Sequence, residues 1–173
     1  MTNRAALIGL GSNKPFLGRS CEEVMRGASA ALSSLGTDVV LSPLYRSPAW
    51  PDPSQPPYVN AVARLETALS PEALLTGLQA IEAGFGRVRH DDPALRYAPR
   101  TLDLDLLALG GEVREGEALS LPHPRLAERD FVLLPLRDVA SEWVHPLTGE
   151  GAEEMLARLS EVTATKTVIP ESR

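Results

Sequence analysis

Short apolar runs alternate with amphipathic stretches along the first two thirds of the chain. Residues 4–10 form an apolar run, which predicts a buried strand. Residues 20–36 follow with apolar side chains at helical spacing, and they open with Ser20 and Glu23 spaced as a capping box. Residues 38–47 then predict a strand that is interrupted or bent at a proline.

The alternation continues with a clearer strand and helix. Residues 58–67 alternate their side chains between two faces, which is typical of a strand. Residues 70–86 predict a helix with Ser70 as its N-cap and Pro71 at its first position. Residues 101–109 predict one more strand. The order strand, helix, strand, strand, helix, strand predicts an α+β fold of the ferredoxin-like type.

The remaining sequence, from residue 110 onward, has a weaker pattern. It contains a buried-looking apolar run at 131–136 and an amphipathic stretch at 152–159 that predicts a late helix. We therefore expect a C-terminal extension of the ferredoxin-like core. A chain of 173 residues can bury one real core but not two generous ones, so we expect residues 1–173 to form one domain.

Composition narrows the classes of function. A formal net charge of −6 argues against a general binder of nucleic acid or of anionic membranes. The single cysteine, Cys21, excludes an intramolecular disulfide and suits a reducing compartment. We see no signal-peptide pattern and no apolar run of the roughly 20 residues that span a bilayer. We therefore expect a cytoplasmic protein, and a monomer because no exposed apolar stripe is evident.

Two carboxylates share one face of the strand at 101–109. Asp103 and Asp105 alternate with leucines, so their Cβ atoms lie about 6.5–7 Å apart on the same side. Converging carboxylates repel each other, and their hard oxygens favour Mg²⁺ or Ca²⁺ over zinc. For this motif alone, a solvated pair or a pair bound to arginines is the stronger alternative.

The neighbourhood of the carboxylates favours phosphate chemistry. Arg87, Arg89, Arg96 and Arg100 lie just before them, and guanidinium groups suit phosphate oxygens. Arginines beside a pair of acids are typical of phosphoryl transfer, where catalysis is mostly positioning and charge neutralisation. The alternative is a set of surface salt bridges. The proline-rich stretch 47–57 is long enough to be a functional loop. We expect this loop and the basic loop 86–98 to be mobile in the free protein, and ATP with Mg²⁺ to order at least one of them.

Several motifs in one order identify a family. The segment RYAPRTLDLDLL (96–107) resembles the signature of the 6-hydroxymethyl-7,8-dihydropterin pyrophosphokinases of folate biosynthesis. GLGSN (9–13), LYRSPAW (44–50), QPPYVNAVARLET (55–67) and LPHPRLAERDFVLLPL (121–136) are similar to further blocks of that family. The resemblance implies a ferredoxin-like enzyme that transfers pyrophosphate from ATP to the hydroxymethyl group of the pterin and releases AMP.

The resemblance also implies a role for each matching residue. Asp103 and Asp105 would hold two Mg²⁺ ions that bridge the phosphates of the co-substrate ATP. Arg87 and Arg100 would join them in catalysis as phosphate-binding arginines. The implied ATP contacts are Gln79, Glu82, Arg87, Arg89, Arg100, Leu106, Ser120, His123 and Arg129. The implied contacts to the reduced hydroxymethylpterin are Ser47, Pro48, Trp50, Tyr58, Asn60, Tyr97 and Phe131.

Other functions stay open at this point. Another metal-dependent nucleotidyl or phosphoryl transferase would use the same acidic strand. A ferredoxin-like regulatory domain would bind a nucleotide without chemistry, but it has no need for Asp103 and Asp105 beside Arg87 and Arg100. RNA binding also occurs in this fold class, yet the aromatic sheet face and the basic excess that it requires are missing.

Overall fold

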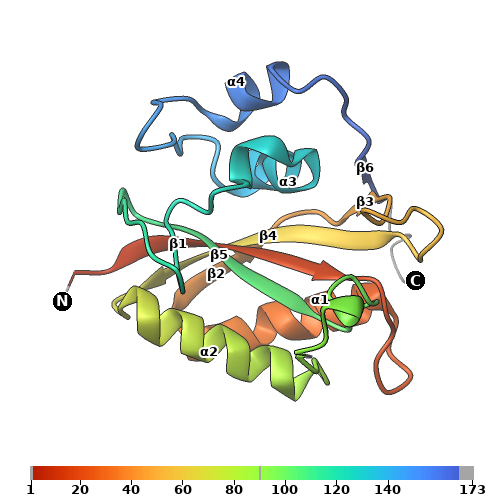
Figure 1. The fold of residues 1–173 in the computed structure, drawn as a ribbon. Coiled ribbons are helices and arrows are strands. Elements are labelled where there is room, and N and C mark those ends of the chain that lie inside the picture. The colour runs from red at the N-terminus through yellow and green to blue at the C-terminus, as the bar shows by residue number, and fades with distance from the viewer. Residues whose placement is uncertain (1, 90, 168–173) are drawn as a thin grey trace, which may run out of the picture.

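An antiparallel sheet with helices on both faces forms the centre of the computed structural model, which describes residues 2–89 and 91–167 (Figure 1). The strands are β1 (Arg4–Ser12), β2 (Thr37–Leu41), β3 (Tyr45–Ser47), β4 (Tyr58–Thr67), β5 (Asp103–Leu109) and β6 (Thr165–Lys166). The α-helices are α1 (Cys21–Ala31), α2 (Pro71–Gly84), α3 (Asp130–Val139) and α4 (Ala152–Ala157). Short 3₁₀ turns occur at Leu32–Ser34, Pro93–Leu95 and Leu126–Glu128. Within the described residues, no helix has the length and apolar character to cross a membrane.

The sheet confirms the predicted ferredoxin-like order of elements. Its described strands run in the order β5-β1-β4-β3-β6, with β2 also paired to β4, and all these pairings are antiparallel. The strand predicted at 38–47 is interrupted as expected, because β2 ends at Leu41 and β3 begins at Tyr45. These two pieces lie along different halves of β4, which makes them one broken strand of the ferredoxin-like core.

The helices begin where the capping residues predict. The Ser20 side chain accepts a hydrogen bond from the Glu23 N–H, and the Glu23 carboxylate accepts one from the Ser20 N–H. Ser70 caps α2, with Pro71 in its first turn. The α1 helix is shorter than predicted, since it tightens into a 3₁₀ turn at Leu32–Ser34.

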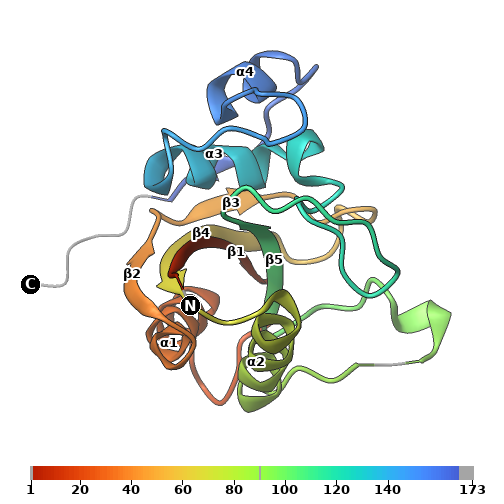
Figure 2. The same cartoon turned by 90° about the vertical axis from the view of Figure 1, so that its left-hand side faces the viewer.

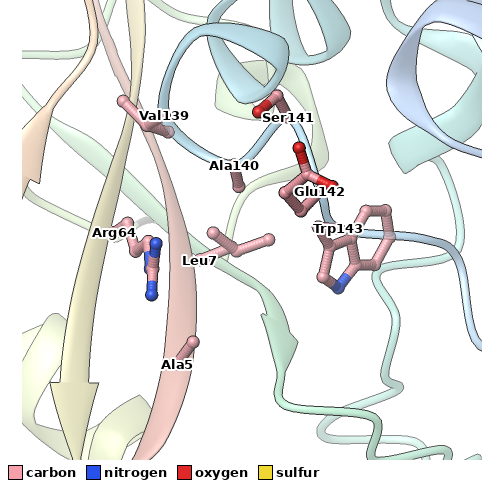
Figure 3. A pocket seen from close by; sticks show the side chains of 8 residues that line it. All are labelled: Ala5, Leu7, Arg64, Val139, Ala140, Ser141, Glu142 and Trp143. Atoms are coloured by element: carbon pink, nitrogen blue, oxygen red, sulfur yellow. The ribbon is translucent and has the colours of Figure 1, made fainter.

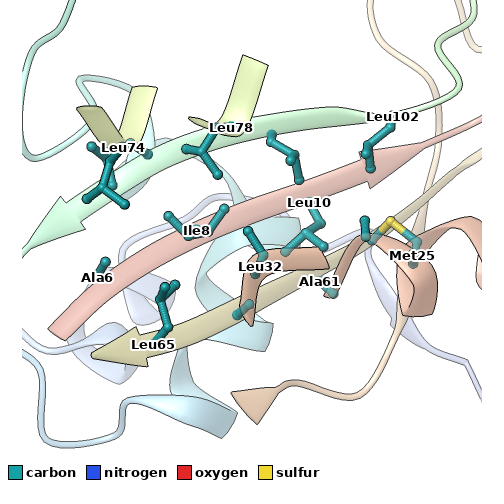
Figure 4. Close-up of a cluster of buried hydrophobic side chains, with 14 of the residues drawn as sticks. Ala6, Ile8, Leu10, Met25, Leu32, Ala61, Leu65, Leu74, Leu78 and Leu102 are labelled. Carbon is teal, nitrogen blue, oxygen red and sulfur yellow. The ribbon is translucent and has the colours of Figure 1, made fainter. Parts of the chain in front are cut away.

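The face of the sheet under α1 and α2 carries the larger apolar core (Figure 4). Leu102, Leu104 and Leu106 face these helices, as their alternation predicts. They meet Leu74 and Leu78 of α2. This layer needs only apolar packing to be stable.

The opposite face is covered by α3, and α4 packs on the outer side of α3 (Figure 2). The run 131–136, which the sequence indicates only as buried, belongs to α3 and even includes Pro135. A short continuous apolar run does not distinguish a helix from a buried strand by its periodicity. The predicted helix at 152–159 ends earlier, at Ala157.

Candidate functional site

The two carboxylates of β5 lie beside glycines of β1. Asp103 pairs with Gly11 and Asp105 pairs with Gly9, so both acids share the sheet face that α3 partly covers. Leu104 points to the opposite face. The shared face of the two aspartates is thus confirmed, and no side chain stands next to them on β1.

The same row continues across β1 to the strand β4. Gly11 pairs with Asn60 on its other side, so the row reads Asp103, Gly11, Asn60. A Cβ added at Gly11 would lie 3.7 Å from Asn60 Oδ1 and 3.7 Å from Tyr58 Cδ1. Two strand spacings, about 10 Å, therefore separate the acidic side from the amide and aromatic side. Gly11 has no side chain and so leaves space between Asp103 and Asn60, which we call the floor of the site.

Asp105 is held in an environment that disfavours its charge. Burial and the nearby negative charge of Asp103 together raise the pKa of Asp105 to about 6, and burial is the larger of the two causes. Asp103 itself forms an ion pair with Arg100, with 2.7 Å between Nη1 and Oδ2. The alternative of an arginine-bound carboxylate therefore holds for Asp103. Among the described residues, Asp105 has no ion pair within 4 Å.

The donor set of this pair suits a hard cation. Both ligands are carboxylates that share one face, and a cation between them would relieve the unfavourable charge of Asp105. In the described part of the chain, no group of three or more His, Cys, Asp or Glu side chains is arranged to hold a metal.

Arg87 and Arg100 lie close to one another beside the acids. The Nε of Arg87 is buried and has no hydrogen-bond partner among the described residues. Burial lowers the pKa of Arg87, and the charge of Arg100 lowers it further. Arg100 is fixed by the backbone, because its Nη2 donates to the Arg96 carbonyl over 2.6 Å. An unpartnered buried donor next to a second cation is a place where an anion would bind well.

Glu82 joins α2 to the acidic strand. Its side chain is 1% exposed, and Oε1 accepts the Leu104 N–H over 2.8 Å. That N–H points away from the sheet because β5 is an edge strand. The second oxygen of Glu82 pairs with Arg89. Burial raises the pKa of Glu82, which the Leu104 N–H offsets only in part. Both oxygens are thus engaged within the protein.

His123 is a neutral hydrogen-bond donor near Arg129 and Asp103. Its Nδ1 accepts the Arg125 N–H over 3.1 Å, so the proton of the neutral ring is on Nε2. Burial lowers the pKa of His123 to about 4, together with the charges of Arg129 and Arg125. Arg129 also lies over the ring of Phe131, 5.7 Å from its centre.

The remaining predicted ATP contacts are one residue of α2, one residue of β5 and one residue of a turn. Gln79 is exposed on α2. Leu106 belongs to the core under α2, on the opposite face of β5 from the carboxylates. The Ser120 hydroxyl donates to the Gly116 carbonyl over 3.1 Å and closes a turn.

Three predicted pterin contacts come together where β3 and β4 pair. Ser47 pairs with Tyr58, and Asn60 Nδ2 donates to Ser47 Oγ over 2.9 Å. Tyr58 is half-buried, and burial raises the pKa of its hydroxyl. Phe131 is half-buried in the first turn of α3.

Two loops meet through aromatic side chains. Trp50 and Tyr97 make an edge-to-face contact with 5.8 Å between ring centres, although both are exposed. Arg125 lies over the Trp50 ring at 5.4 Å. Pro48 is exposed at the start of the first loop. The proline-rich loop and the basic loop therefore touch each other.

Asn13 is a residue whose role the sequence does not reveal. It is 2% exposed, and its Nδ2 donates to the Pro56 carbonyl over 3.1 Å. Its Oδ1 accepts the Arg100 N–H over 2.7 Å. Asn13 therefore connects the proline-rich loop to Arg100, which lies between the basic loop and β5. The motif GLGSN contains it, but nothing in that motif states which groups the amide binds.

A separate hollow of about 280 Å³ lies at the other end of the sheet (Figure 3). It is lined by Ala5, Leu7, Arg64, Val139, Ala140, Ser141, Glu142 and Trp143. None of the predicted site residues is among them. The hollow is therefore distinct from the site described above.

The fold and the site define a class of protein: a ferredoxin-like α+β fold with carboxylates and arginines at one end of its sheet. The family model of the 7,8-dihydro-6-hydroxymethylpterin-pyrophosphokinases (HPPK) matches residues 7–141. The chain belongs to this family, which confirms the resemblance carried by its motifs.

Curated relatives agree with the family. A 2-amino-4-hydroxy-6-hydroxymethyldihydropteridine pyrophosphokinase of Synechocystis sp. is 39% identical over 168 residues, which cover 95% of this chain and 80% of the relative. A protein of the same name from Haemophilus influenzae is 43% identical over 143 residues, covering 82% of this chain and 84% of the relative.

Solved structures support the fold. The wild-type Plasmodium falciparum HPPK-DHPS with pteroate superposes with a TM-score of 0.68 and 12% identity. The match covers 90% of this chain and 44% of that one, so this chain spans less than half of the Plasmodium protein. At this identity the likeness shows the fold alone, which is the ferredoxin-like fold predicted.

Proposed function

We propose that this chain transfers pyrophosphate from ATP to the hydroxymethyl group of 6-hydroxymethyl-7,8-dihydropterin, giving the pterin diphosphate and AMP. The names of the relatives support this reaction. The observation that carries the proposal is the row Asp103, Gly11, Asn60. It sets groups suited to phosphate and metal about 10 Å from groups suited to a flat heterocycle, with an open floor between them.

Mg²⁺ is the metal that we propose for the two aspartates, as two ions bound with ATP. Proteins usually bind Mg²⁺ through one or two carboxylates together with substrate phosphates, and Asp103 and Asp105 supply such a pair. The bound ions would neutralise phosphate charge and align the reacting oxygens. The raised pKa of Asp105 supports a cation at this position.

The arginines and the histidine bind the triphosphate in this proposal. Arg87 donates from its buried Nε, and Arg100 adds a second charge beside it. His123 donates from Nε2 while staying neutral, so it adds a hydrogen bond without adding charge. Arg129 balances Asp105 from the start of α3. Arg100 and His123 are held by hydrogen bonds to the backbone before substrate binds, which favours electrostatic catalysis.

The amide and the aromatic rings orient the pterin. Asn60 offers a donor and an acceptor to the edge of the ring, and its bond to Ser47 fixes which way the amide points. Tyr58 and Phe131 supply faces for stacking. Trp50 and Tyr97, which contact each other, would exclude water from the phosphates when both substrates are bound.

The test is a product assay. The protein is mixed with ATP, Mg²⁺ and the reduced pterin, and nucleotides are separated by ion-exchange chromatography. We expect AMP and the pterin diphosphate in equal amounts, each dependent on both substrates. Asp103→Asn should remove the activity, and Asp38→Asn, an exposed carboxylate on β2, should keep it.

Other products would contradict the proposal in different ways. ADP would indicate single phosphoryl transfer, and AMP without pterin would indicate hydrolysis. Nucleotide binding without any product would indicate a regulatory domain. Activity that survives EDTA unchanged would remove the metal from the proposal, whereas loss with EDTA and recovery with Mg²⁺ supports it.

A further inference from the structure

A buried carboxylate joins the start of α3 to the C-terminal segment. Asp130 is 7% exposed, and its Oδ1 accepts the Phe131 N–H over 2.7 Å. Its Oδ2 accepts the N–H groups of Thr163 and Ala164, the latter over 2.8 Å, and the Thr163 hydroxyl over 3.3 Å. Hydrogen bonds to an ionised group are about twice as strong as neutral ones, so this carboxylate is a firm anchor.

The anchored segment continues as an added strand. From Ala164 the chain enters β6, which pairs antiparallel with Tyr45 and Arg46 of β3. The Thr167 N–H then donates to the Leu44 carbonyl over 2.7 Å. In Figure 1 the segment descends from α4 past the end of α3 to the edge of the sheet at β3. We call residues 163–167 the strap.

The strap supports the strand that shapes the pterin side. β3 has only three residues, and its pairing with β4 ends at Ser47, the residue that holds the Asn60 amide. A strand this short gains little from one partner, so the second partner β6 contributes to its order. The proline-rich loop begins directly after Ser47.

We propose that Asp130 is a positioning residue for the pterin. It fixes Phe131 directly through the backbone and fixes Ser47 indirectly, through the strap and β3. A carboxylate suits this role because both of its oxygens accept N–H groups, whereas an asparagine amide would turn its NH₂ group toward an N–H donor on one side or the other. The match to the family model ends at residue 141, so this contact joins the matched region to a segment beyond it. The inference rests on the proposed function.

The experiment compares two carboxylate-to-amide changes in the full chain. Asp130→Asn removes the anchor, and Glu154→Gln is the matched control, because Glu154 accepts the Gly151 N–H at the start of α4 without touching the strap. For Asp130→Asn we expect the KM for the pterin to rise about tenfold, as for the loss of one buried charged hydrogen bond. The KM for ATP should change less than about threefold, and Glu154→Gln should leave both values unchanged.

Hydrogen exchange gives a readout that does not depend on turnover. In Asp130→Asn, the amides of the strap and of Tyr45 should exchange about tenfold faster or more, with the amides of α2 unchanged. Ala164→Pro removes one donor N–H while keeping the carboxylate, and it should reproduce both effects. It also carries the test if Asp130→Asn does not fold. The double variant should lose no more than the more affected single variant, because both changes break one contact.

The outcomes separate this inference from the proposed function. A faster-exchanging strap with an unchanged KM for the pterin would overturn the positioning role, as would a lower melting temperature with no change in either KM. Wild-type protein that forms no AMP would overturn the proposed function instead. In that case pterin fluorescence titrations of the same variants still decide whether Asp130 orders a pterin site.

Discussion

The strand β5 presents two very different faces. On the side of α2, Leu102, Leu104 and Leu106 are at most 4% exposed and pack into the apolar core. On the other side, Asp103 and Asp105 lie over a floor of glycine, and burial raises the pKa of Asp105 to about 6. One face is satisfied by its own packing. The other contains charge that the protein alone does not fully compensate.

This contrast separates stability from activity within a single strand. The apolar side chains stabilise the fold in proportion to the area that they bury. The buried Asp105 and the buried Nε of Arg87, which has no partner among the described residues, cost stability because burial removes them from water. Functional sites commonly carry such a cost. A change on the apolar face should therefore lower stability with little effect on activity. A change on the acidic face should lower activity without lowering stability.

The largest expected effect is on the acidic face. Asp105→Asn should lower the rate of AMP formation at least about a thousandfold, the upper range for one preorganised electrostatic group. The variant should be at least as stable as the wild type at about pH 8, because ionised Asp105 opposes folding when its folded pKa is raised. Calorimetric melting and the product assay measure both quantities.

The pH dependence of that stability difference is a control. The wild type should lose stability relative to Asp105→Asn as the pH rises through about 6, where the carboxyl ionises in the folded chain. Below about pH 4 the two proteins should converge. A variant that melts lower than the wild type at about pH 8 would contradict the cost assigned to this residue.

The second effect belongs to the apolar face. Leu74 lies in the first turns of α2, is 0% exposed and packs against the sheet (Figure 4). Leu74→Ala should lower the free energy of unfolding by about 2–5 kcal/mol, through lost burial and a residual cavity. The kcat per folded molecule should stay within about twofold, since Leu74 faces away from the acids. Urea denaturation gives the first value, and a large loss of kcat would remove the contrast between the faces.

Much of this contrast can be predicted from the sequence. Alternation along 101–109 separates the leucines from the aspartates because side chains in a strand point to opposite faces. The caps Ser20 and Ser70 locate two helix starts because their chemistry is local. The family motifs locate the site residues but assign their roles only by resemblance.

Contacts between distant segments are what the sequence does not reveal. Asn13 binds Pro56 and Arg100, more than 40 residues away in each case, and no spacing rule relates them. Asp130 binds the strap 33 residues further on. The helix α3 also escapes prediction, since its apolar run contains Pro135 and has no polar face long enough to reveal a helical period.

A smaller effect is expected at Gly11, which forms the floor between the carboxylates and the pterin side of the site. Gly11→Ala places a methyl group in ordinary contact with Asn60 and Tyr58, at 3.7 Å from each, so the fold should tolerate it. The methyl group narrows the space between the acids and the pterin side. We expect the KM for the pterin to rise about tenfold, the cost of a modest steric misfit.

The matched control is a glycine with open space around it. A Cβ at Gly84, at the end of α2, meets no atom within 4 Å. Gly84→Ala should leave both KM values unchanged and stabilise the protein by about 0.5–1 kcal/mol. Steady-state kinetics with each substrate varied in turn give the comparison. Equal KM values for Gly11→Ala and the wild type would show that the floor is not part of the pterin site.

The smallest effect is the change of kcat/KM near neutral pH, which depends on two titrating groups of the site, Asp105 and His123. The profile of kcat/KM reports the pKa values of the free enzyme, in which Asp105 titrates at about 6 and His123 at about 4. A metal ligand must be deprotonated, so kcat/KM should fall about tenfold per pH unit below about 6. Between about pH 7 and 8 it should vary less than about twofold, because His123 is already neutral there. His123→Gln keeps a neutral side chain and should leave the position of the acid limb unchanged. If the acid limb of the profile moves in this variant, the titration belongs to His123 and not to Asp105.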